Sequence, residues 1–344
     1  MSRPAWWCWL LLWANGCGLD YYLHLARGQA RIAWRSEPIG LILASSTTSP
    51  VTAEKLRLIA ELRVFARQRL GLKTGDSYTR FFDTGGQPVS WNVSASPPER
   101  FVPYLWHFPI VGDLPYKGFF SRERAARERD ALQAAGLDVA MGPVSAYSTL
   151  GFFSDPVLST MLDEEEDRLA ELILHELTHA TIYPPGQAEY SESAATFVGQ
   201  AGALVFLAEK HGPDSPQLRQ ARLRQEDARR FSAFMKEAVD SLDSLYAQDL
   251  PRAEVLKLRQ EVFARAKERY RSRRGEFQVD NYDAFLKWEV NNARLLSYRR
   301  YHLDLELFAR VFSTWEAHPD RAISVFADCG EDPAPWDCLR RVAI

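Results

Sequence analysis

Two histidines and a glutamate form the pattern in this sequence that is best suited to chemistry. His175, Glu176 and His179 occur as H-E-x-x-H inside the apolar segment Leu169–Ala180. At helical spacing the two histidines lie one turn apart on one face, so both imidazoles can reach a single ion at about 2.0–2.1 Å, the distance that zinc requires. Glu176 is then free to take a proton from a water that the metal activates.

The pattern is specific because histidine is rare in this chain. There are 7 His among 344 residues, and an H-E-x-x-H is expected by chance only about 0.01 times in such a sequence. Two histidines and a glutamate would also be costly to bury in an apolar helix without a ligand. The alternative is an unliganded histidine pair that is hydrogen-bonded within a core.

A catalytic zinc needs three protein ligands and one open position, so a third ligand is expected close by. Pro184-Pro185-Gly186 ends the first helix, and helical periodicity resumes around Glu192. Small neighbours would let the second helix approach the first closely: Ser191, Ser193, Ala194 and Ala195. Glu189 is the competing ligand, although an acid at a helix start is also favoured by the macrodipole alone. We therefore predict one zinc per chain, held by His175, His179 and Glu192.

The N-terminal sequence predicts export. Arg3 is the only charge before an apolar run over residues 5–13. That run is too short for a membrane-spanning helix of about 20 residues, but it has the length of a signal-peptide core. It leads to Ala14-Asn15-Gly16-Cys17, which resembles the lipobox of bacterial lipoproteins. We predict a signal peptide over 1–17, acylation of Cys17, and a periplasmic or membrane-anchored protein. An ordinary cleaved signal or a buried N-terminal helix is the alternative.

The remaining cysteines favour the same compartment. Cys8 would leave with the signal and Cys17 would carry lipid, so Cys329 and Cys338 are left as an even pair. They flank a turn rich in glycine and proline over 330–335. In an oxidising compartment the two could form a disulfide, while two reduced surface thiols are the alternative.

The elements expected around these residues are mainly helical. Apolar spacing predicts helices over 21–34, 52–70 and 121–135, and two long charged helices over 217–248 and 252–273 that form an antiparallel hairpin. Short β-branched and aromatic runs predict strands at 77–82, 89–95, 104–110, 137–141 and 145–153. This indicates an α+β fold, with a small mixed or antiparallel sheet packed on a helical core and a helical C-terminal half. We expect one domain over 18–344, with an α+β part over 18–160 and a helical part with the zinc site over 161–344.

Composition indicates that the chain can form a hydrophobic core, and it argues against some classes of function. Hydrophobic residues make up 46% of the chain and charged residues 25%, which is enough apolar material for a substantial core. The formal net charge is −3, whereas nucleic-acid-binding domains are usually strongly basic. We therefore expect no nucleic-acid partner, and membrane contact only through a lipid anchor on Cys17.

The zinc segment also carries a family resemblance. H-E-L-T-H at 175–179, followed by S-E-S-A-A-T at 191–196, resembles the gluzincin arrangement of zinc metallopeptidases. The longer sequence is similar to a bacterial family of predicted aminopeptidases, whose members are typically exported. Other matching motifs are Gly16-Cys17, Tyr21-Tyr22, Arg27-Gly28-Gln29, Trp91-Asn92-Val93, and the segments 115–120, 146–151 and 291–295. The resemblance implies zinc, hydrolysis of peptide bonds in peptides or proteins, and an envelope location. Ser191 stands where it leads us to expect Asn, which would remove a possible contact that supports the ligands but would not remove the ligand itself.

Substrate and transition-state contacts are less well defined. Peptidases of this kind usually hold the substrate backbone along a strand edge, and the candidate edge is Tyr147, Ser148, Thr149, Leu150 and Gly151. A second donor to the developing oxyanion is expected, for which the candidates are Tyr298, Tyr301 and His302. An aminopeptidase also needs an acid for the substrate amine, and Asp155 is the nearest one to the candidate edge.

Three functions fit these residues. The first is a zinc peptidase of the cell envelope with Glu176 as general base. The second is a zinc-binding pseudoenzyme that serves as an envelope scaffold, against which Glu176 argues because only catalysis needs it. The third is a zinc amidase acting on cell-wall peptides, which only a substrate screen would separate from the first.

Overall fold

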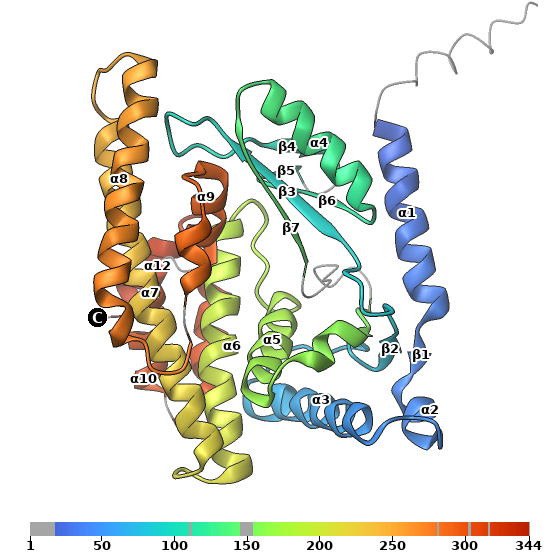
Figure 1. Ribbon diagram of the computed structural model, residues 1–344. Coiled ribbons are helices and arrows are strands. Elements are labelled where there is room, and N and C mark those ends of the chain that lie inside the picture. Colours follow the sequence, from blue (N-terminus) through green and yellow to red (C-terminus); the bar gives the residue numbers. More distant parts are fainter. Residues whose placement is uncertain are drawn as a thin grey trace, which may run out of the picture.

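The computed structural model describes residues 18–109, 112–144, 154–280, 282–301, 304–315 and 317–343, apart from the side chains of Gly18, Arg300 and Tyr301. Across these residues the chain is mainly helical, with small sheets confined to its N-terminal half (Figure 1). The predicted α+β class is therefore confirmed. The expected signal peptide and Cys17 lie outside the described residues.

The N-terminal part begins with α1 (Gly18–Arg35), β1 (Glu37–Pro38), α2 (Ile39–Ala44) and α3 (Pro50–Arg69). The α3 helix begins at Ser49, whose hydroxyl accepts a hydrogen bond from the Thr52 backbone N–H, and Pro50 occupies the first turn. Its apolar face is buried against the helix that carries His175 and His179, so α3 forms one wall of the main core.

Three small sheets follow among the described residues. One sheet has the order β1–β2–β8, with β2 (Arg80–Phe82) antiparallel to β1 and parallel to β8 (Val157–Leu158). The second has β3 (Trp91–Ser96) at its centre, antiparallel to both β6 (Lys117–Phe119) and β7 (Asp138–Pro143). The third is the pair β4 (Trp106–Phe108) and β5 (Gly112–Leu114). Helix α4 (Arg122–Ala134) packs on the second sheet.

The first predicted strand is shorter than expected. Residues 75–78 form a turn, in which Tyr78 has a φ of 60°, and the strand starts only at Arg80. A side chain in the left-handed region cannot continue an extended strand. The strand predicted over 104–110 is likewise confined to β4, and the strand predicted over 145–153 lies outside the described residues.

The rest of the chain is helical. A 3-10 turn (Ser159–Asp163) leads into α5 (Glu166–His179), which α6 (Ala188–His211) follows in an antiparallel direction. The predicted hairpin is formed by α7 (Pro216–Tyr246) and α8 (Arg252–Arg273), which lie side by side at one edge of the molecule (Figure 1). This hairpin, Phe285 and α9 (Asn292–Tyr301) together form a second hydrophobic core.

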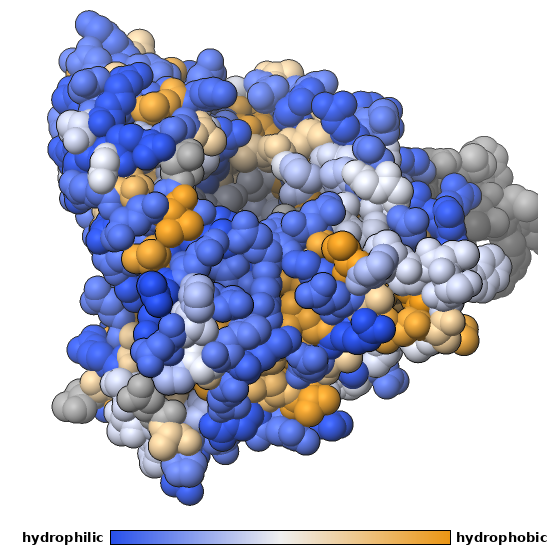
Figure 2. Space-filling view, turned by 60° about the horizontal axis from the view of Figure 1, so that its bottom comes forward, coloured by the Kyte–Doolittle hydropathy of each residue, from blue (hydrophilic) through white to orange (hydrophobic). Residues whose placement is uncertain are grey.

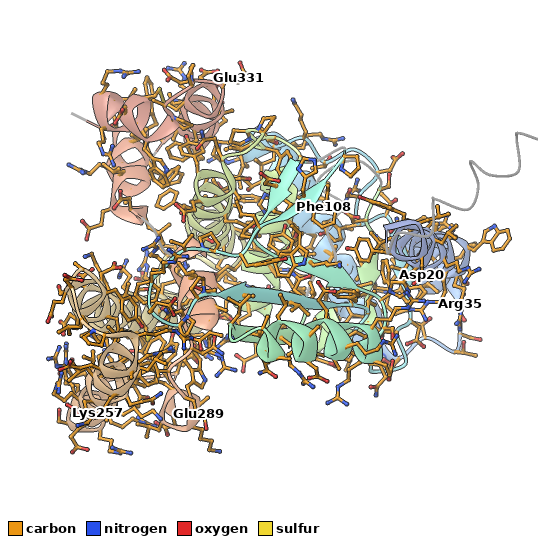
Figure 3. The ribbon with its side chains drawn as sticks, turned by 90° about the horizontal axis from the view of Figure 1, so that it is seen from above. Asp20, Arg35, Phe108, Lys257, Glu289 and Glu331 are labelled. Atoms are coloured by element: carbon orange, nitrogen blue, oxygen red, sulfur yellow. A yellow bond between two sulfur atoms is a disulfide. The ribbon has the colours of Figure 1, made fainter. Side chains whose placement is uncertain are left out.

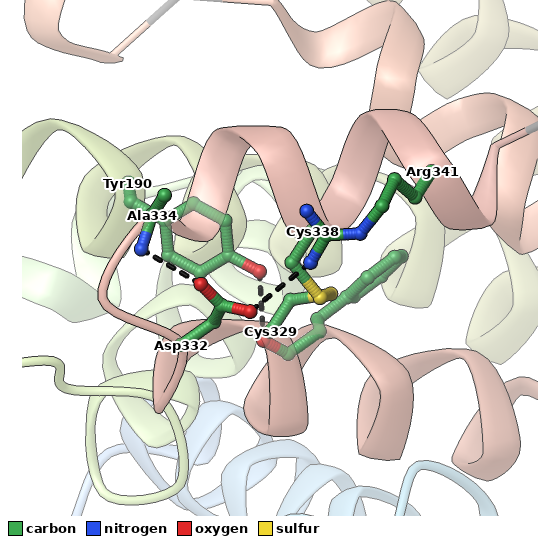
Figure 4. Close-up of a disulfide and its surroundings, with 7 residues drawn as sticks. Tyr190, Cys329, Asp332, Ala334, Cys338 and Arg341 are labelled. Carbon is green, nitrogen blue, oxygen red and sulfur yellow. Dashed lines mark hydrogen bonds and ion pairs between the residues drawn. A yellow bond between two sulfur atoms is a disulfide. The ribbon is translucent and has the colours of Figure 1, made fainter.

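Three short helices complete the fold on the outer side of α6. They are α10 (Leu305–Thr314), α11 (Pro319–Gly330) and α12 (Pro335–Val342). A disulfide joins Cys329 at the end of α11 to Cys338 in α12 (Figure 4). Beside it, the Tyr190 hydroxyl of α6 donates to the Phe326 carbonyl oxygen at 2.7 Å. The C-terminal helices are thereby held against the start of α6.

The face of the molecule shown in Figure 2 is largely hydrophilic, with hydrophobic residues in separate small patches. None of the helices in the described ranges combines the length and the apolar character needed to cross a bilayer.

Candidate metal centre

The α5 helix positions the H-E-x-x-H residues. Acidic Glu166 and Asp167 occupy its first turn, where they complement the helix macrodipole. Its apolar residues are buried on one side: Leu169, Ala170, Ile173, Leu174 and Leu177. This burial fixes the rotation of the helix about its axis, so His175 and His179 share a face that meets α6.

The α6 helix approaches α5 unusually closely because its contact positions are glycines. A Cβ atom at Gly199 would lie 2.7 Å from the Glu171 carbonyl oxygen and 3.2 Å from the His175 Cβ. At Gly202 it would lie 3.0 Å from Leu174 Cδ1 of α5 and 2.9 Å from Leu70 Cδ1 at the end of α3. A larger residue at Gly199 would push α5 and α6 apart, because the nearest atom that it meets belongs to the backbone of α5. The close approach predicted from the small residues of α6 is thus present, and two glycines beyond the predicted set contribute to it.

Three side chains of these helices converge on one point. The Nε2 atoms of His175 and His179 are 3.3 Å apart, and the Glu192 Oε2 atom lies 3.5 Å from each of them. The side chains are 17%, 4% and 13% exposed respectively. We call His175, His179 and Glu192 the donor triad. Among the described residues they are the group of His, Cys, Asp and Glu whose spacing could hold a metal ion.

The electrostatics of the triad favour an anionic carboxylate. Burial alone would raise the pKa of Glu192, but hydrogen bonds from both histidines and their charge depress it far below its ordinary value. Burial alone would lower the pKa of His175, yet its bond to Glu192 and the charge of Glu176 raise it overall. The triad therefore brings one carboxylate and two imidazole nitrogens to a single point, where a bound cation would neutralise the carboxylate charge.

Ser191 supports the triad from behind. Its hydroxyl donates to the Ile182 carbonyl oxygen at 3.2 Å and lies 3.2 Å from His179 Nδ1. Since the hydroxyl proton is used on Ile182, the oxygen accepts from Nδ1–H of His179, so that the neutral form of this histidine would direct the lone pair of Nε2 at the triad centre. The departure from Asn at this position does not remove the contact behind the ligands, contrary to our expectation.

Two tyrosines near the triad were missed by sequence reasoning. Burial and then the charge of Glu192 raise the pKa of Tyr183, which is half-buried in the turn after α5. Burial, followed by the charges of Glu176 and Asp155, raises the pKa of Tyr78 well above its ordinary value. The Tyr78 hydroxyl is buried and has no hydrogen-bond partner among the described residues. Tyr183 had a sequence signal, since it lies only four residues past His179, whereas Tyr78 had none.

The other predicted site residues are less directly placed. Tyr298 packs in the second core, and its hydroxyl shares a hydrogen bond of 3.0 Å with Ser232 on α7. The competing ligand Glu189 is exposed in the first turn of α6. Asp155 is buried, and its carbonyl oxygen accepts from the Tyr78 N–H at 2.6 Å. The Tyr301 side chain, His302 and the candidate edge over 147–151 lie outside the described residues.

A separate polar cavity of about 110 Å³ lies between α5, α6 and α7. Glu171 lines it one helical turn before His175, and burial raises the pKa of this carboxyl. Arg224 lines the opposite side and pairs with Asp167 at 2.7 Å and Glu165 at 2.5 Å. The ion pairs of Arg224 therefore join α7 to the N-terminal end of α5.

Fold and site together define an α+β protein with a candidate metal centre on two closely packed helices. A family model described as "Putative aminopeptidase" matches residues 20–333, which is most of the chain, and the chain belongs to that family. Membership supports a peptidase, with a peptide as its substrate. Comparisons with curated proteins and with solved structures found no match.

Proposed function

We propose that this protein is a zinc-dependent peptidase of the gluzincin type, with His175, His179 and Glu192 as ligands and Glu176 as general base. Family membership supports the peptidase class. The zinc dependence and the role of each residue rest on the arrangement of the donor triad. That arrangement is the single observation that carries the proposal.

The triad fits zinc in chemistry and in spacing. Two imidazole nitrogens and one carboxylate oxygen are a common ligand set for a catalytic zinc site. Tetrahedral bonds of about 2.0–2.1 Å separate neighbouring ligand atoms by about 3.3–3.4 Å. The three separations here are 3.3, 3.5 and 3.5 Å. Little movement of the side chains would therefore be needed to bind the ion.

When bound, zinc would lower the pKa of a water toward about 7 and polarise the substrate carbonyl. His179 is held for this by Ser191, which fixes its tautomer. Glu176 follows His175 directly and takes the proton of the attacking water, then delivers it to the leaving amine. Tyr183 lies near Glu192, where a hydroxyl donor could stabilise the developing oxyanion.

The setting of this activity is also part of the proposal. The apolar run over 5–13 and the Gly16-Cys17 pair support a bacterial envelope protein anchored by an acyl chain on Cys17. The disulfide between Cys329 and Cys338 is compatible with an oxidising compartment. Cleavage from a free N-terminus is the preference that the family description suggests.

The test compares zinc content and peptide turnover in three glutamate variants. Elemental mass spectrometry measures zinc per chain, and mass spectrometry follows a peptide mixture with free and with blocked N-termini. Glu192→Gln should lose most of its zinc and its turnover. Glu176→Gln should keep zinc and lose about 10²–10⁴-fold in turnover. Glu189→Gln is the matched control, and both of its readouts should stay unchanged.

The outcomes separate the parts of the proposal. One zinc per chain that is lost in Glu192→Gln, together with turnover lost in both variants, supports it. Zinc without turnover of any peptide would favour a binding protein over an enzyme. Absence of zinc after reconstitution would overturn the metal site. Equal cleavage of blocked and free peptides would exclude an aminopeptidase preference while leaving the peptidase intact.

A further inference from the structure

The α1 helix has an inner face that attaches it to the rest of the molecule. Gly28 packs so closely on Phe120 that a Cβ atom would lie 2.0 Å from that ring. Tyr21 donates its hydroxyl proton to the Gly118 carbonyl oxygen at 2.9 Å, and the Phe120 N–H donates to His24 Nε2 at 3.0 Å. Ile32 completes this face and is buried.

The opposite face of α1 is apolar although it is exposed. We call this face the outer stripe, and its residues are Leu19, Tyr22, Leu23, Ala26, Ala30 and Trp34. At 3.6 residues per turn they fall within about 120° of the helix circumference. Trp34 is 92% exposed, Leu19 59% and Leu23 47%. A soluble surface seldom presents such a continuous stripe without a partner.

A row of positive charge borders the outer stripe. Arg27, Arg31 and Arg35 follow one another at four-residue spacing and are exposed. The ion pairs of the described residues include none of these three arginines. The one acidic residue of α1, Asp20, pairs with Arg124 of α4 at 2.5 Å. The unpaired charge beside the stripe is therefore positive.

The place of α1 in the molecule leaves this face open. The helix stands at the outer edge of the molecule in Figure 1, and in the view from above Asp20 and Arg35 are labelled at that same edge (Figure 3). It starts at Gly18, immediately after Cys17 and the apolar run over 5–13. If that segment carries an anchor, α1 is the element that the anchor would place nearest to the bilayer.

We propose that the outer stripe of α1 docks on an anionic phospholipid bilayer, with the helix lying along the lipid interface. Leucine and aromatic residues on one face with arginine beside them are the composition of helices that bind in this way. The arginines then contact lipid phosphates while Trp34, Tyr22 and Leu23 enter the headgroup region. Docking would hold the catalytic body at a set orientation to the membrane, independently of the metal at the donor triad.

The test uses the chain from Gly18 to Ile344, which contains every described element and carries no acyl anchor. Sedimentation with vesicles of phosphatidylcholine, with or without phosphatidylglycerol, measures its partitioning. Leu23→Ser with Trp34→Ser should weaken binding to the anionic vesicles by about tenfold or more. Changing Arg27, Arg31 and Arg35 to Gln should cost about fivefold per arginine at low salt. Val342→Ser is the matched control, because Val342 is as exposed as Leu23, at 47%.

Binding that needs phosphatidylglycerol, weakens with salt, falls in both α1 variants and persists in Val342→Ser supports the proposal. Circular dichroism and zinc content verify that the α1 variants remain folded. Failure of the unsubstituted chain to bind either vesicle would overturn it. So would unchanged binding of the Leu23→Ser, Trp34→Ser variant. Light scattering gives a third outcome, since loss of a dimer in that variant would assign the stripe to a second copy of the chain.

Discussion

The hydroxyl of Ser191 lies between the His179 imidazole and the Ile182 carbonyl oxygen, at 3.2 Å from each. It therefore links the turn after α5 to a histidine of the donor triad. Ser191→Ala should weaken zinc binding by about 10–100-fold, because the tautomer and ring orientation of His179 would no longer be held. Competition with a chelator of known affinity measures the change.

Thr178→Ala is the matched control for that variant. The Thr178 hydroxyl is also buried on α5, but it donates to the Leu174 carbonyl oxygen of its own helix at 2.7 Å. Its loss should leave the zinc affinity unchanged. Equal losses in the two variants would mean that Ser191 contributes only packing.

The contact between Gly199 and the Glu171 carbonyl oxygen sets the distance between α5 and α6. Gly199→Ala should lower the free energy of unfolding by about 1–3 kcal/mol, because the added methyl has no room and the helices must separate. The zinc affinity should fall as well, since Glu192 lies on the displaced helix. Urea unfolding and chelator competition provide the two readouts. In the control Gly40→Ala the new Cβ meets no atom within 4 Å, and a comparable loss there would refute the steric explanation.

The buried hydroxyl of Tyr78 has no partner among the described residues. An unpaired buried hydroxyl costs about 1–3 kcal/mol, so Tyr78→Phe should raise the free energy of unfolding, measured with urea. Tyr190→Phe is the contrast, since the Tyr190 hydroxyl donates to the Phe326 carbonyl oxygen at 2.7 Å. That variant should lose about 1 kcal/mol. A loss of stability in Tyr78→Phe would instead show that water or another group pairs with the hydroxyl in solution.

His24 makes the attachment of α1 dependent on pH. Partial burial, and then the charge of Arg124, lower the pKa of His24 below its ordinary value of 6.5, and Nε2 must stay unprotonated to accept from the Phe120 N–H. Because the folded pKa is depressed, the stabilisation is fully present above about pH 6.5 and is lost as the pH falls through the folded value. Hydrogen exchange of α1 should accelerate over that range. The acceleration should be absent in His24→Gln, which does not titrate, and its persistence there would assign the effect to another group.

Local signals predicted most of the elements and the residues of the donor triad. Apolar spacing placed α3, α5 and the α7–α8 hairpin because a helix buries one face at a period that is visible in the sequence. Breaking residues such as Pro184 predicted a helix end for an equally local reason. The 13-residue step from His179 to Glu192 indicated a turn and a returning helix, and the structure brings the two side chains together.

Tertiary structure decided the features that depend on residues far apart in the chain. Tyr78 lies close to 100 residues before Glu176 in the sequence, and only the packing of the main core, which contains Tyr78 and the apolar side of α5, places its hydroxyl near that carboxylate. The role of Ser191 depends on the direction in which the chain turns after α5, because that direction brings the Ser191 hydroxyl to His179 Nδ1. The outward face of α1 is defined only in the folded chain, where Gly28 and Ile32 are buried on the opposite side of the helix. Helix periodicity determines which residues share a face, whereas the packing of the whole chain determines what that face meets.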